Sequence, residues 1–387
     1  MNFKIPDYVS NIIQTLENNG YEAYIVGGCV RDILMGITPH DYDITTNALP
    51  QEIKSLFRIT IDTGIKHGTV TVIIDNEPVE ITTYRTEGIY SDNRRPDNIN
   101  FVTKLSEDLS RRDFTVNAIC YNESKGYVDL FGGKEDIENR ILRAVGNPAN
   151  RFREDSLRIL RLFRFASTLG FKIETKTFED AISYSNLIKN VSRERIAEEL
   201  KKAVIGDDIS ILHPLINSNA FDFLSIKSCQ NLTNVKKLQK KTDLRMFALL
   251  FLCNCDVLSV AAELKSSNKS RNYFEAFLNL NSDKIPSSKY EIKKIINRYG
   301  EEIFEDYLDF LTHIKNINCQ NLYALLREIQ KNQEPYSITQ LDINGSDIIS
   351  LGYKDKDIGE TLNILLDEVM KNPSLNIKDE LIKFLIK

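Results

Sequence analysis

The stretch Gly27-Gly28-Cys29-Val30-Arg31-Asp32, with Asp41-Tyr42-Asp43 nine residues further on, decides how this chain folds. It follows an apolar run at 23–26 that predicts a short buried strand. The two glycines leave room where a backbone turns sharply or closely approaches another group. A short helix that ends at Gly36 comes next, and a second strand contains the two aspartates. The pattern predicts a strand, a glycine turn, a helix and a strand in immediate succession.

Asp41 and Asp43 are two residues apart in the second predicted strand. Side chains alternate along a strand, so both carboxylates project from the same face. Two carboxylates on one face repel each other unless a cation lies between them, and Mg²⁺ takes such oxygen ligands together with substrate phosphates. Asp-x-Asp is also common in solvated loops, and Gly-Gly by itself marks only a turn. The combination favours a metal-dependent site for phosphoryl or nucleotidyl transfer.

A third carboxylate belongs to a predicted hairpin. Residues 67–85 alternate in the pattern of two strands joined by a turn at 75–77. On the returning strand, Glu80, Thr82 and Tyr84 share one face. If that strand lies beside the strand of the two aspartates, Glu80 supplies a third carboxylate to the site. The alternative is a solvated charge at a sheet edge.

Two further stretches bring arginines toward the same region. Residues 86–100 lack periodicity, and their Tyr90 and Arg94-Arg95 would suit either a lid over a nucleotide or a plain surface loop. Arg111-Arg112 stand just before an apolar stretch. Guanidinium forks suit triphosphate oxygens, although a pair of surface arginines has the same pattern.

The second informative stretch is 151–165, whose apolar residues recur with helical periodicity. In one continuous helix, Asp155 and Arg158 stand at i, i+3 and meet on one face, and Arg161 and Arg164 continue that row. The row would hold a triphosphate, while an aspartate and an arginine present an acceptor and a donor to a base edge. Adenine and cytosine offer an amine beside a ring acceptor, whereas guanine and uracil present the opposite order. A surface ion pair is the simpler alternative.

The composition of the whole chain bounds the remaining possibilities. Its 387 residues suit two to four domains or subdomains. It has no run of about 18 apolar residues and no apolar signal segment, so we expect a cytoplasmic protein without a membrane span. The six cysteines lack zinc spacing and suit reduced thiols. The chain has a net charge of −5, so any contact with nucleic acid must come from local basic patches. The lysines at 236–241 and 265–271 are candidates for such patches, and the alternative is that they form ordinary solvated surfaces.

Five ordered motifs between residues 21 and 200 resemble those of the bacterial class II tRNA nucleotidyltransferases, the CCA-adding enzymes. That family belongs with poly(A) polymerases to the DNA polymerase β-like superfamily. The helical C-terminal half matches only in being helical and of suitable length. The motifs are Gly27-Gly28-x-Val30-Arg31-Asp32 with Asp41-x-Asp43, Glu80–Arg85 with its loop, Arg111-Arg112-Asp113-Phe114, Glu154-Asp155-x-x-Arg158 and Glu194-Arg195-Ile196-x-x-Glu199.

The resemblance implies an α+β fold, with an N-terminal polymerase β-like nucleotidyltransferase head that contains a mixed sheet, followed by an all-helical neck, body and tail. We expect the head at 1–140, the neck with the nucleotide-selecting motif at 141–205, the body at 206–270, and a tRNA-binding tail at 271–387. The implied reaction is a two-metal nucleotidyl transfer that adds CMP, CMP and AMP in turn to the tRNA 3′ end, using CTP and ATP without a nucleic-acid template and releasing pyrophosphate.

The resemblance also implies roles for single residues. Asp41 and Asp43 would ligate Mg²⁺, and Glu80 is the candidate for a further catalytic carboxylate. Residues that match Asp155 and Arg158 select CTP and ATP in the family by pairing with the base edge. Further contacts to the bound nucleotide are implied for Gly28, Arg31, Arg112, Arg161 and Arg164, and a supporting role behind the selecting helix for Glu194 and Arg195.

Several alternatives stay open. A poly(A) polymerase of the same family shares every motif of the head and neck, and differs mainly in how it handles RNA. A specialist that adds only A or only CC is another possibility, although the intact pattern from Arg85 to Pro96 disfavours a CC-only enzyme. A catalytically inactive RNA-binding protein on this fold would need a broken carboxylate pair, and both Asp41 and Asp43 are present. The sequence also leaves open whether the protein is a homodimer.

Overall fold

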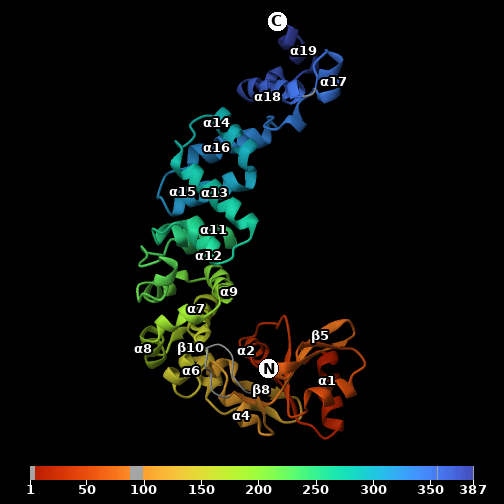
Figure 1. Ribbon diagram of the computed structural model, residues 1–387, viewed down its shortest axis with the longest axis vertical. Helices are drawn as coiled ribbons and strands as arrows, with labels where there is room; N and C mark the ends of the chain where they lie inside the picture. The colour runs from red at the N-terminus through yellow and green to blue at the C-terminus, as the bar shows by residue number, and fades with distance from the viewer. Residues whose placement is uncertain (1–4, 88–98, 355, 387) are drawn as a thin grey trace. The chain divides into compact units, whose positions relative to one another are not determined.

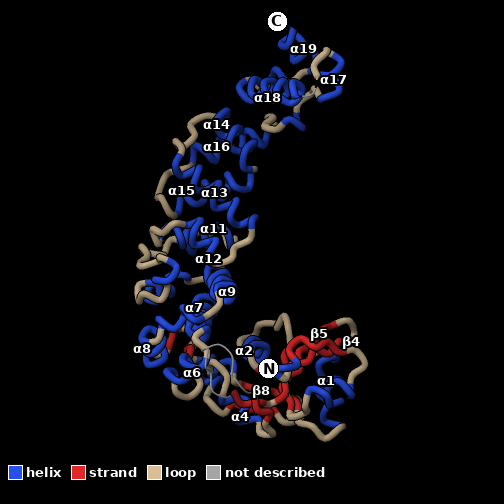
Figure 2. Tube along the Cα trace, in the orientation of Figure 1, coloured by secondary structure: helices blue, strands red, loops and turns tan. Residues whose placement is uncertain are grey.

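The computed structural model of the protein describes residues 5–87, 99–354 and 356–386. It contains two compact units. Unit 1 comprises Met1–Thr233 with Leu252–Cys255 and Glu263–Lys265, and unit 2 comprises Asn234–Phe251, Asp256–Ala262 and Ser266–Lys387. Within the described residues, every strand lies between Ala23 and Ile173, and the remainder is helix and loop (Figure 2). The predicted α+β class, with a mixed sheet followed by helices, is confirmed.

Seven strands of unit 1 form one mixed sheet in the order β3-β4-β5-β2-β1-β8-β9. Strands β2 and β5 run parallel, and the other neighbouring pairs run antiparallel. The predicted hairpin is β4 and β5, and β5 does lie beside β2. Strand β2 begins at Asp43, so the prediction that Asp41 also belongs to this strand is wrong. The strands are β1 (Ala23–Val26), β2 (Asp43–Thr46), β3 (Thr60–Gly64), β4 (Thr69–Ile74), β5 (Glu77–Thr83), β8 (Ile119–Asn122) and β9 (Gly126–Asp129).

Short helices and one two-stranded pair surround this sheet. Strand β1 is buried along its whole length because α1 and α2 pack against it. The pair β6 (Arg85–Glu87) and β7 (Ile99–Phe101) is antiparallel. The helices of this region (Figure 1) are α1 (Asp7–Asn18), α2 (Gly28–Leu34), α3 (Pro50–Leu56), α4 (Leu105–Ser110) and α5 (Gly133–Glu138), with the single 3₁₀ turns η1 (Ile65–His67) and η2 (Thr115–Asn117).

The turn between β1 and α2 requires glycine. Gly27 has φ 84°, a left-handed backbone conformation that residues other than glycine adopt only at an energetic cost. A Cβ atom at this position would also lie 3.2 Å from Nη1 of Arg112. The predicted strand, glycine turn, helix and strand are therefore present in that order, and the turn brings the start of α2 close to a predicted nucleotide-binding arginine.

The returning strand of the hairpin is one residue shorter than its alternation predicts. Strand β5 ends at Thr83, and the backbone N–H of Tyr84 donates to Thr46 O at 2.6 Å. The side chain of Tyr84 is fully buried, and its hydroxyl donates to Glu22 Oε2 at 3.3 Å. Tyr84 lies one residue beyond the end of β5, so its place on the face of Glu80 and Thr82 stays a prediction.

The helical remainder of unit 1 contains a break that the periodicity did not predict. Residues 151–165 belong to two helices, α6 (Pro148–Glu154) and α7 (Leu157–Leu169), and Asp155 has an extended backbone with φ −132° and ψ 104°. The expected i, i+3 placement of Asp155 and Arg158 on one helix is therefore wrong. The other elements here are β10 (Ile141–Leu142), β11 (Lys172–Ile173), α8 (Thr175–Ser183), η3 (Ser185–Asn190), α9 (Arg193–Val204), η4 (Ile209–Leu212), α10 (His213–Ile216) and η5 (Asp222–Leu224).

Unit 2 is helical throughout its described residues. Its centre is an aromatic cluster in which Phe247 contacts Phe274, Phe277 and Phe310, with ring centroids 4.9–6.0 Å apart. No single helix of the described chain is long and apolar enough to cross a membrane, and only α11 and α12, bent by 119°, meet that test when taken together. The helices after η6 (Val235–Lys237) are α11 (Thr242–Leu252), α12 (Val257–Glu263), α13 (Asn268–Ser282), α14 (Lys289–Tyr299), α15 (Glu301–His313), α16 (Gln320–Lys331), η7 (Ile338–Gln340), α17 (Gly345–Ser350), α18 (Lys356–Lys371), η8 (Pro373–Leu375) and α19 (Lys378–Ile386). The bounds of the four expected domains stay a prediction.

Candidate active site

Three carboxylates lie near the beginning of β2, close enough for the charges of Asp41 and Glu80 to act on Asp43. Asp43 is the first residue of β2 and lies directly across from Glu80 of β5 in the parallel register, so their side chains project from the same face of the sheet. Asp41 precedes Asp43 by two residues. Desolvation, and then the charges of Asp41 and Glu80, raise the pKa of Asp43 to about 6, while Arg112 lowers it. Asp43 is still open to solvent on one side, so its carboxylate is accessible to a cation.

A cavity of about 170 Å³ adjoins these carboxylates. Asp43 and Glu80 line it together with the arginines Arg85, Arg111 and Arg112. A cavity that presents both carboxylates and guanidinium groups suits a ligand that combines phosphate oxygens with a divalent cation. The strand pairing and the arginine pair therefore bring together residues that are some 70 positions apart in the sequence.

A buried acid that the sequence reasoning missed holds the arginine pair. Asp108 of α4 is fully buried, and its Oδ1 accepts from Arg111 Nη2 at 2.7 Å. Its Oδ2 is 3.5 Å from Nη2 of Arg112 and accepts from the Thr45 hydroxyl at 3.2 Å. Burial raises the pKa of Asp108, but the two guanidinium groups outweigh it and lower that pKa overall. The i, i+3 and i, i+4 spacing of one acid before two arginines was the signal for this clamp.

In the part of the chain that the structure describes, Arg112 has one buried donor without a partner, and it lines the cavity. Within the described residues, its Nε is buried and has no hydrogen-bond partner. The group lies beside the Gly27 turn, where any larger residue would approach its Nη1. An unpaired buried donor is costly to leave unsatisfied.

Arg31 is held rigidly at the C-terminal half of α2. Its Nη2 and Nε donate to Asp32 Oδ1 at 2.7 and 2.9 Å, and its Nη1 donates to Asn117 Oδ1 at 2.8 Å. The side chain is only 10% exposed. Gly28 opens the same helix, and a Cβ atom there would lie 3.7 Å from Nη2 of Arg31, an ordinary contact distance. The predicted phosphate-binding side of the site is thus already ordered.

The arginine row of α7 is not a solvated face, because Arg158 is buried and Arg161 and Arg164 are partly buried and ion-paired. Arg158 is 7% exposed, and its Nη1 donates to Glu154 Oε2 at 2.8 Å, while its Nη2 donates to the carbonyl of Arg111 at 2.8 Å. Arg161 binds the carboxylate of Asp113, with Nη2 and Oδ2 2.6 Å apart. These contacts attach α7 to residues 111 and 113 of the strand-containing region.

Helix α9 supports the same row from behind. Arg164 Nε lies 2.6 Å from Glu199 Oε2 in an ion pair whose angle falls short of a hydrogen bond. Arg195 Nη2 lies 3.2 Å from Asp155 Oδ2, while Asp155 Oδ1 accepts from the backbone N–H of Leu157. Asp155 therefore caps α7 with one oxygen and binds α9 with the other. The supporting role expected of Arg195 stays a prediction.

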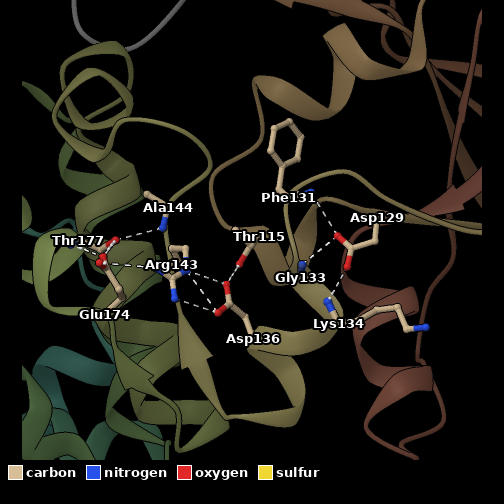
Figure 3. Close-up of polar contacts among 10 residues, drawn as sticks. All are labelled: Thr115, Asp129, Phe131, Gly133, Lys134, Asp136, Arg143, Ala144, Glu174 and Thr177. Atoms are coloured by element: carbon tan, nitrogen blue, oxygen red, sulfur yellow. Dashed lines mark hydrogen bonds and ion pairs between the residues drawn. The ribbon is translucent and has the colours of Figure 1, made fainter.

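The turn that carries Asp113 and Asn117 is anchored through Thr115, which contacts Asp136 (Figure 3). The Thr115 hydroxyl donates to Asp136 Oδ2 at 2.6 Å, and the same carboxylate accepts from Arg143 Nε at 3.1 Å. A Cβ atom at Gly133 would lie 2.2 Å from the carbonyl oxygen of Thr115, so the backbone of α5 packs directly on the turn. Residues 113–117 are therefore fixed by contacts outside the site.

Two predicted features fall elsewhere. Tyr90 and Arg94-Arg95 lie outside the described residues. The lysine clusters are exposed except for Lys241, whose Nζ binds Asp306 Oδ1 at 2.8 Å and Glu302 Oε1 at 2.9 Å. Lys241 and Lys269 line a cavity of about 770 Å³ in unit 2, larger than the one at the carboxylates. Three of its acids, Glu301, Glu302 and Asp306, are partnered by lysine, tyrosine and glutamine side chains. Its mixed charges indicate no single ligand chemistry.

Two family models match the chain. One is described as "Poly A polymerase head domain" and covers residues 23–143, and the other as "Probable RNA and SrmB- binding site of polymerase A" and covers residues 170–225. The CCA-adding enzyme of Lactobacillus helveticus is 37% identical over 402 residues, covering 99% of this chain and 98% of the relative. The CCA-adding enzyme of Staphylococcus saprophyticus is 35% identical and covers 96% of each chain.

Solved structures are similar over the same length. The CCA-adding enzyme of Bacillus stearothermophilus in complex with CTP matches with a TM-score of 0.82 and 30% identity, covering 99% of this chain and 98% of that one. The CCA-adding enzyme of Thermotoga maritima complexed with tRNA matches with a TM-score of 0.67 and 19% identity, covering 99% and 96%. The second likeness supports the fold alone.

Proposed function

Because the chain belongs to the CCA-adding enzymes, a family of tRNA nucleotidyltransferases, we propose that it joins CMP, CMP and AMP in turn to the 3′ end of tRNA, from CTP and ATP. Relatives along nearly the whole chain support this, and so does the similar B. stearothermophilus enzyme, which was solved with CTP. The observation that carries the proposal is the register that sets Asp43 across from Glu80 in a cavity also lined by Arg111 and Arg112.

The carboxylates at the start of β2 fit Mg²⁺. Mutual repulsion and desolvation raise the pKa of Asp43, and a cation between the carboxylates would relieve both. Within the described residues, no group of three or more His, Cys, Asp or Glu side chains is arranged to hold a metal by itself. Mg²⁺ suits this, since it is commonly held by one or two carboxylates, waters and substrate phosphates. We assign that role to Asp41 and Asp43, with Glu80 beside them.

Bound there, Mg²⁺ would lower the pKa of the attacking 3′-hydroxyl and neutralise charge on the departing pyrophosphate. The protein's own contribution is positioning. Arg112, with a donor to spare, and Arg31, with its fixed guanidinium, orient the triphosphate of either nucleotide. The turn at Gly27-Gly28 allows the nucleotide to approach the start of α2 closely.

Base choice belongs to the beginning of α7. Asp155 accepts hydrogen bonds and Arg158 donates them, the pairing that cytosine and adenine need and that guanine and uracil oppose. The extended backbone at Asp155 frees its side chain from the helical row, and the Arg195 contact fixes its direction. We assign Arg161 and Arg164 to the same pocket, held by Asp113 and Glu199.

One assay tests the proposed function. The purified protein is given tRNA that ends at the discriminator base, tRNA that ends in CC, and an unrelated RNA, each with CTP and ATP supplied singly and together, in the presence of Mg²⁺. Two C residues and one A on the first substrate, followed by a stop, are expected. Long A tails on unrelated RNA would instead support the poly(A) polymerase alternative, and addition of A alone would support the A-adding specialist.

Three finer expectations belong to the same proposal. We propose that the helical unit 2 supplies much of the tRNA contact, through exposed lysines such as those at 236–240. The protein is expected to work in the reducing cytoplasm, which suits its six free thiols. Light scattering on the purified protein tests the expected homodimer, which stays a prediction.

A further inference from the structure

Asn117 joins two arginines from the two sides of the site. Its Oδ1 accepts from Nη1 of Arg31 at 2.8 Å, and its Nδ2 donates to Oδ1 of Asp113 at 3.3 Å. The other carboxylate oxygen of Asp113 accepts from Arg161 Nε at 2.8 Å. A continuous chain of hydrogen bonds thus runs from the arginine of α2, which faces the triphosphate in the proposed function, to the arginine row of α7, which faces the base.

Asparagine suits this place for a chemical reason. A guanidinium only donates hydrogen bonds and a carboxylate only accepts them, so a bridge between the two needs one acceptor and one donor. A neutral amide offers both without adding a charge. Asn117 is 6% exposed and Asp113 9%, so water does not replace these bonds readily. Arg161 outweighs the effect of burial and lowers the pKa of Asp113 to about 2, so the acceptor is charged at neutral pH.

A second side chain joins the same arginines. The Phe165 ring, which is 7% exposed, lies with its centroid 5.3 Å from the guanidinium carbon of Arg31, 5.3 Å from that of Arg161 and 3.8 Å from that of Arg164. Guanidinium groups are attracted to an aromatic ring. The ring is itself fixed by an edge-to-face contact with Phe114, at 5.9 Å and 84°. Phe165 therefore gives the three arginines a common support.

We propose that Asn117 and Phe165 are positioning residues that hold Arg31 and Arg161 in one fixed spacing, so that the arrangement of the triphosphate and the choice of base depend on each other. Neither residue needs to touch the nucleotide. The anchored turn at 113–117 gives the coupling a rigid base, because Asp136 and α5 fix it from outside the site. This inference rests on the proposed function and adds the connection between its two halves.

The test compares Asn117→Ala with Asn122→Ala. Asn122 is a matched control, because it is also a buried asparagine of the same region, 1% exposed, and its amide donates to Ala23 O at 2.9 Å and Glu17 Oε1 at 3.0 Å, away from the arginines. Both variants are expected to lower Tm. Only Asn117→Ala should weaken CTP binding by calorimetry without tRNA, raise KM for CTP and ATP together by about tenfold, the loss typical of a hydrogen bond to a charged group, and increase incorporation of UMP and GMP.

Two further variants separate the parts of the inference. Asn117→Asp keeps an acceptor for Arg31 but cannot donate to the Asp113 carboxylate, so it should lose base discrimination more than CTP affinity. It also decides the matter if Asn117→Ala does not fold. Phe165→Leu removes the ring and should reproduce the effects of Asn117→Ala, whereas Phe165→Tyr should restore near-wild-type values.

The outcomes are distinct. If Asn117→Ala and Phe165→Leu lower Tm but leave CTP affinity, KM and base discrimination as in Asn122→Ala, the two residues are merely structural and the inference is wrong. If the wild-type protein adds no CCA in the same assay, the proposed function itself fails. CTP binding in the wild type and the variants still reports on the coupling in that case.

Discussion

Arg161 and Asp113 form an ion pair of 2.6 Å across 48 residues of sequence. The pair attaches the arginine row of α7 to the motif that contains Arg111 and Arg112. Because Asp113 also accepts from Asn117, the carboxylate has a partner on each side of the site. The negative charge of Asp113 therefore holds these side chains in place. Its removal should lower the free energy of unfolding more than it lowers the rate of nucleotidyl transfer.

Asp113→Asn should lower the free energy of unfolding by about 2 kcal/mol, less than for a fully buried pair, because a third of the Arg161 side chain is exposed. The substitution keeps the side-chain shape and removes the charge that Arg161 needs. A urea titration followed by circular dichroism measures it. Glu198→Gln, which breaks the exposed pair with Lys201, should cost under about 1 kcal/mol. Equal costs for both would contradict the assignment.

Asp43→Asn should stabilise the folded protein at alkaline pH. The folded-state pKa of Asp43, about 6, lies above the ordinary value of 3.8, so the ionised group destabilises the fold. The protonated Asp43 side chain contributes stability that is fully present below pH 3.8 and is lost as the pH rises through about 6. Without divalent cations, Tm of the variant should exceed that of the wild type at pH 8, and the two should converge near pH 4. A constant difference across this range would show that Asp43 is not the titrating group.

Added Mg²⁺ should reduce the difference in Tm between the wild type and Asp43→Asn. A cation that binds the charged carboxylates stabilises the wild type in proportion to its occupancy. At pH 8, added Mg²⁺ should raise Tm of the wild type more than that of Asp43→Asn and narrow the gap between them. An equal shift in both would place the ion elsewhere.

Asp41→Ala and Asp43→Ala should each reduce nucleotidyl transfer by about a thousandfold or more, since a bound metal supplies several kcal/mol of charge stabilisation. Both variants should keep the wild-type circular dichroism, because neither carboxylate contributes to the apolar core. Glu80→Gln measured alongside them tests the third carboxylate: a comparable loss would make it a direct participant, and a loss under about tenfold would assign it to the local field alone. Retained activity in both alanine variants would contradict the assignment of Asp41 and Asp43 as Mg²⁺ ligands.

Gly27→Ala and Gly20→Ala separate backbone strain from contact with the site. The two glycines have nearly the same φ, 84° and 85°, but an added Cβ atom lies 3.2 Å from Arg112 Nη1 at Gly27 and meets nothing within 4 Å at Gly20. Both substitutions should cost about 1–3 kcal/mol through the left-handed backbone. Only Gly27→Ala should also raise KM for both nucleotides, as steady-state kinetics would measure. A higher KM in both variants would mean that backbone strain, and not contact with Arg112, weakens nucleotide binding.

Arg195→Ala should reduce discrimination between CTP and UTP while leaving triphosphate affinity close to wild type. Its guanidinium binds the free oxygen of Asp155, and without it that carboxylate loses its fixed direction. Arg193→Ala removes an arginine from the same helix whose partners are Glu263 and Phe223, so it is the control. Competition assays with paired nucleotides measure the ratio, and an unchanged ratio in Arg195→Ala would exclude the supporting role.

Much of the strand-containing region follows from local pattern. The run at 23–26, the two glycines and the alternation through residues 67–83 identify strands, turn and hairpin, because side-chain alternation and glycine's freedom are local properties. The break at Asp155 does not follow from it, since the apolar period continues across the break. That break depends on Asp155 capping α7 and binding Arg195, 40 residues away.

The sequence by itself determined which chemical groups the protein has and which local element each one begins or ends: two aspartates at the start of a strand, glycines at a turn, arginines along a helix. Only the tertiary structure decided their partners. Asn117 and Phe165 carried no motif of their own that identified them, and their roles come from contacts such as Arg31 with Asn117, 86 residues apart. Hydrogen bonds and ion pairs act over a few ångströms, so the identity of a partner depends on the fold that brings two distant segments together.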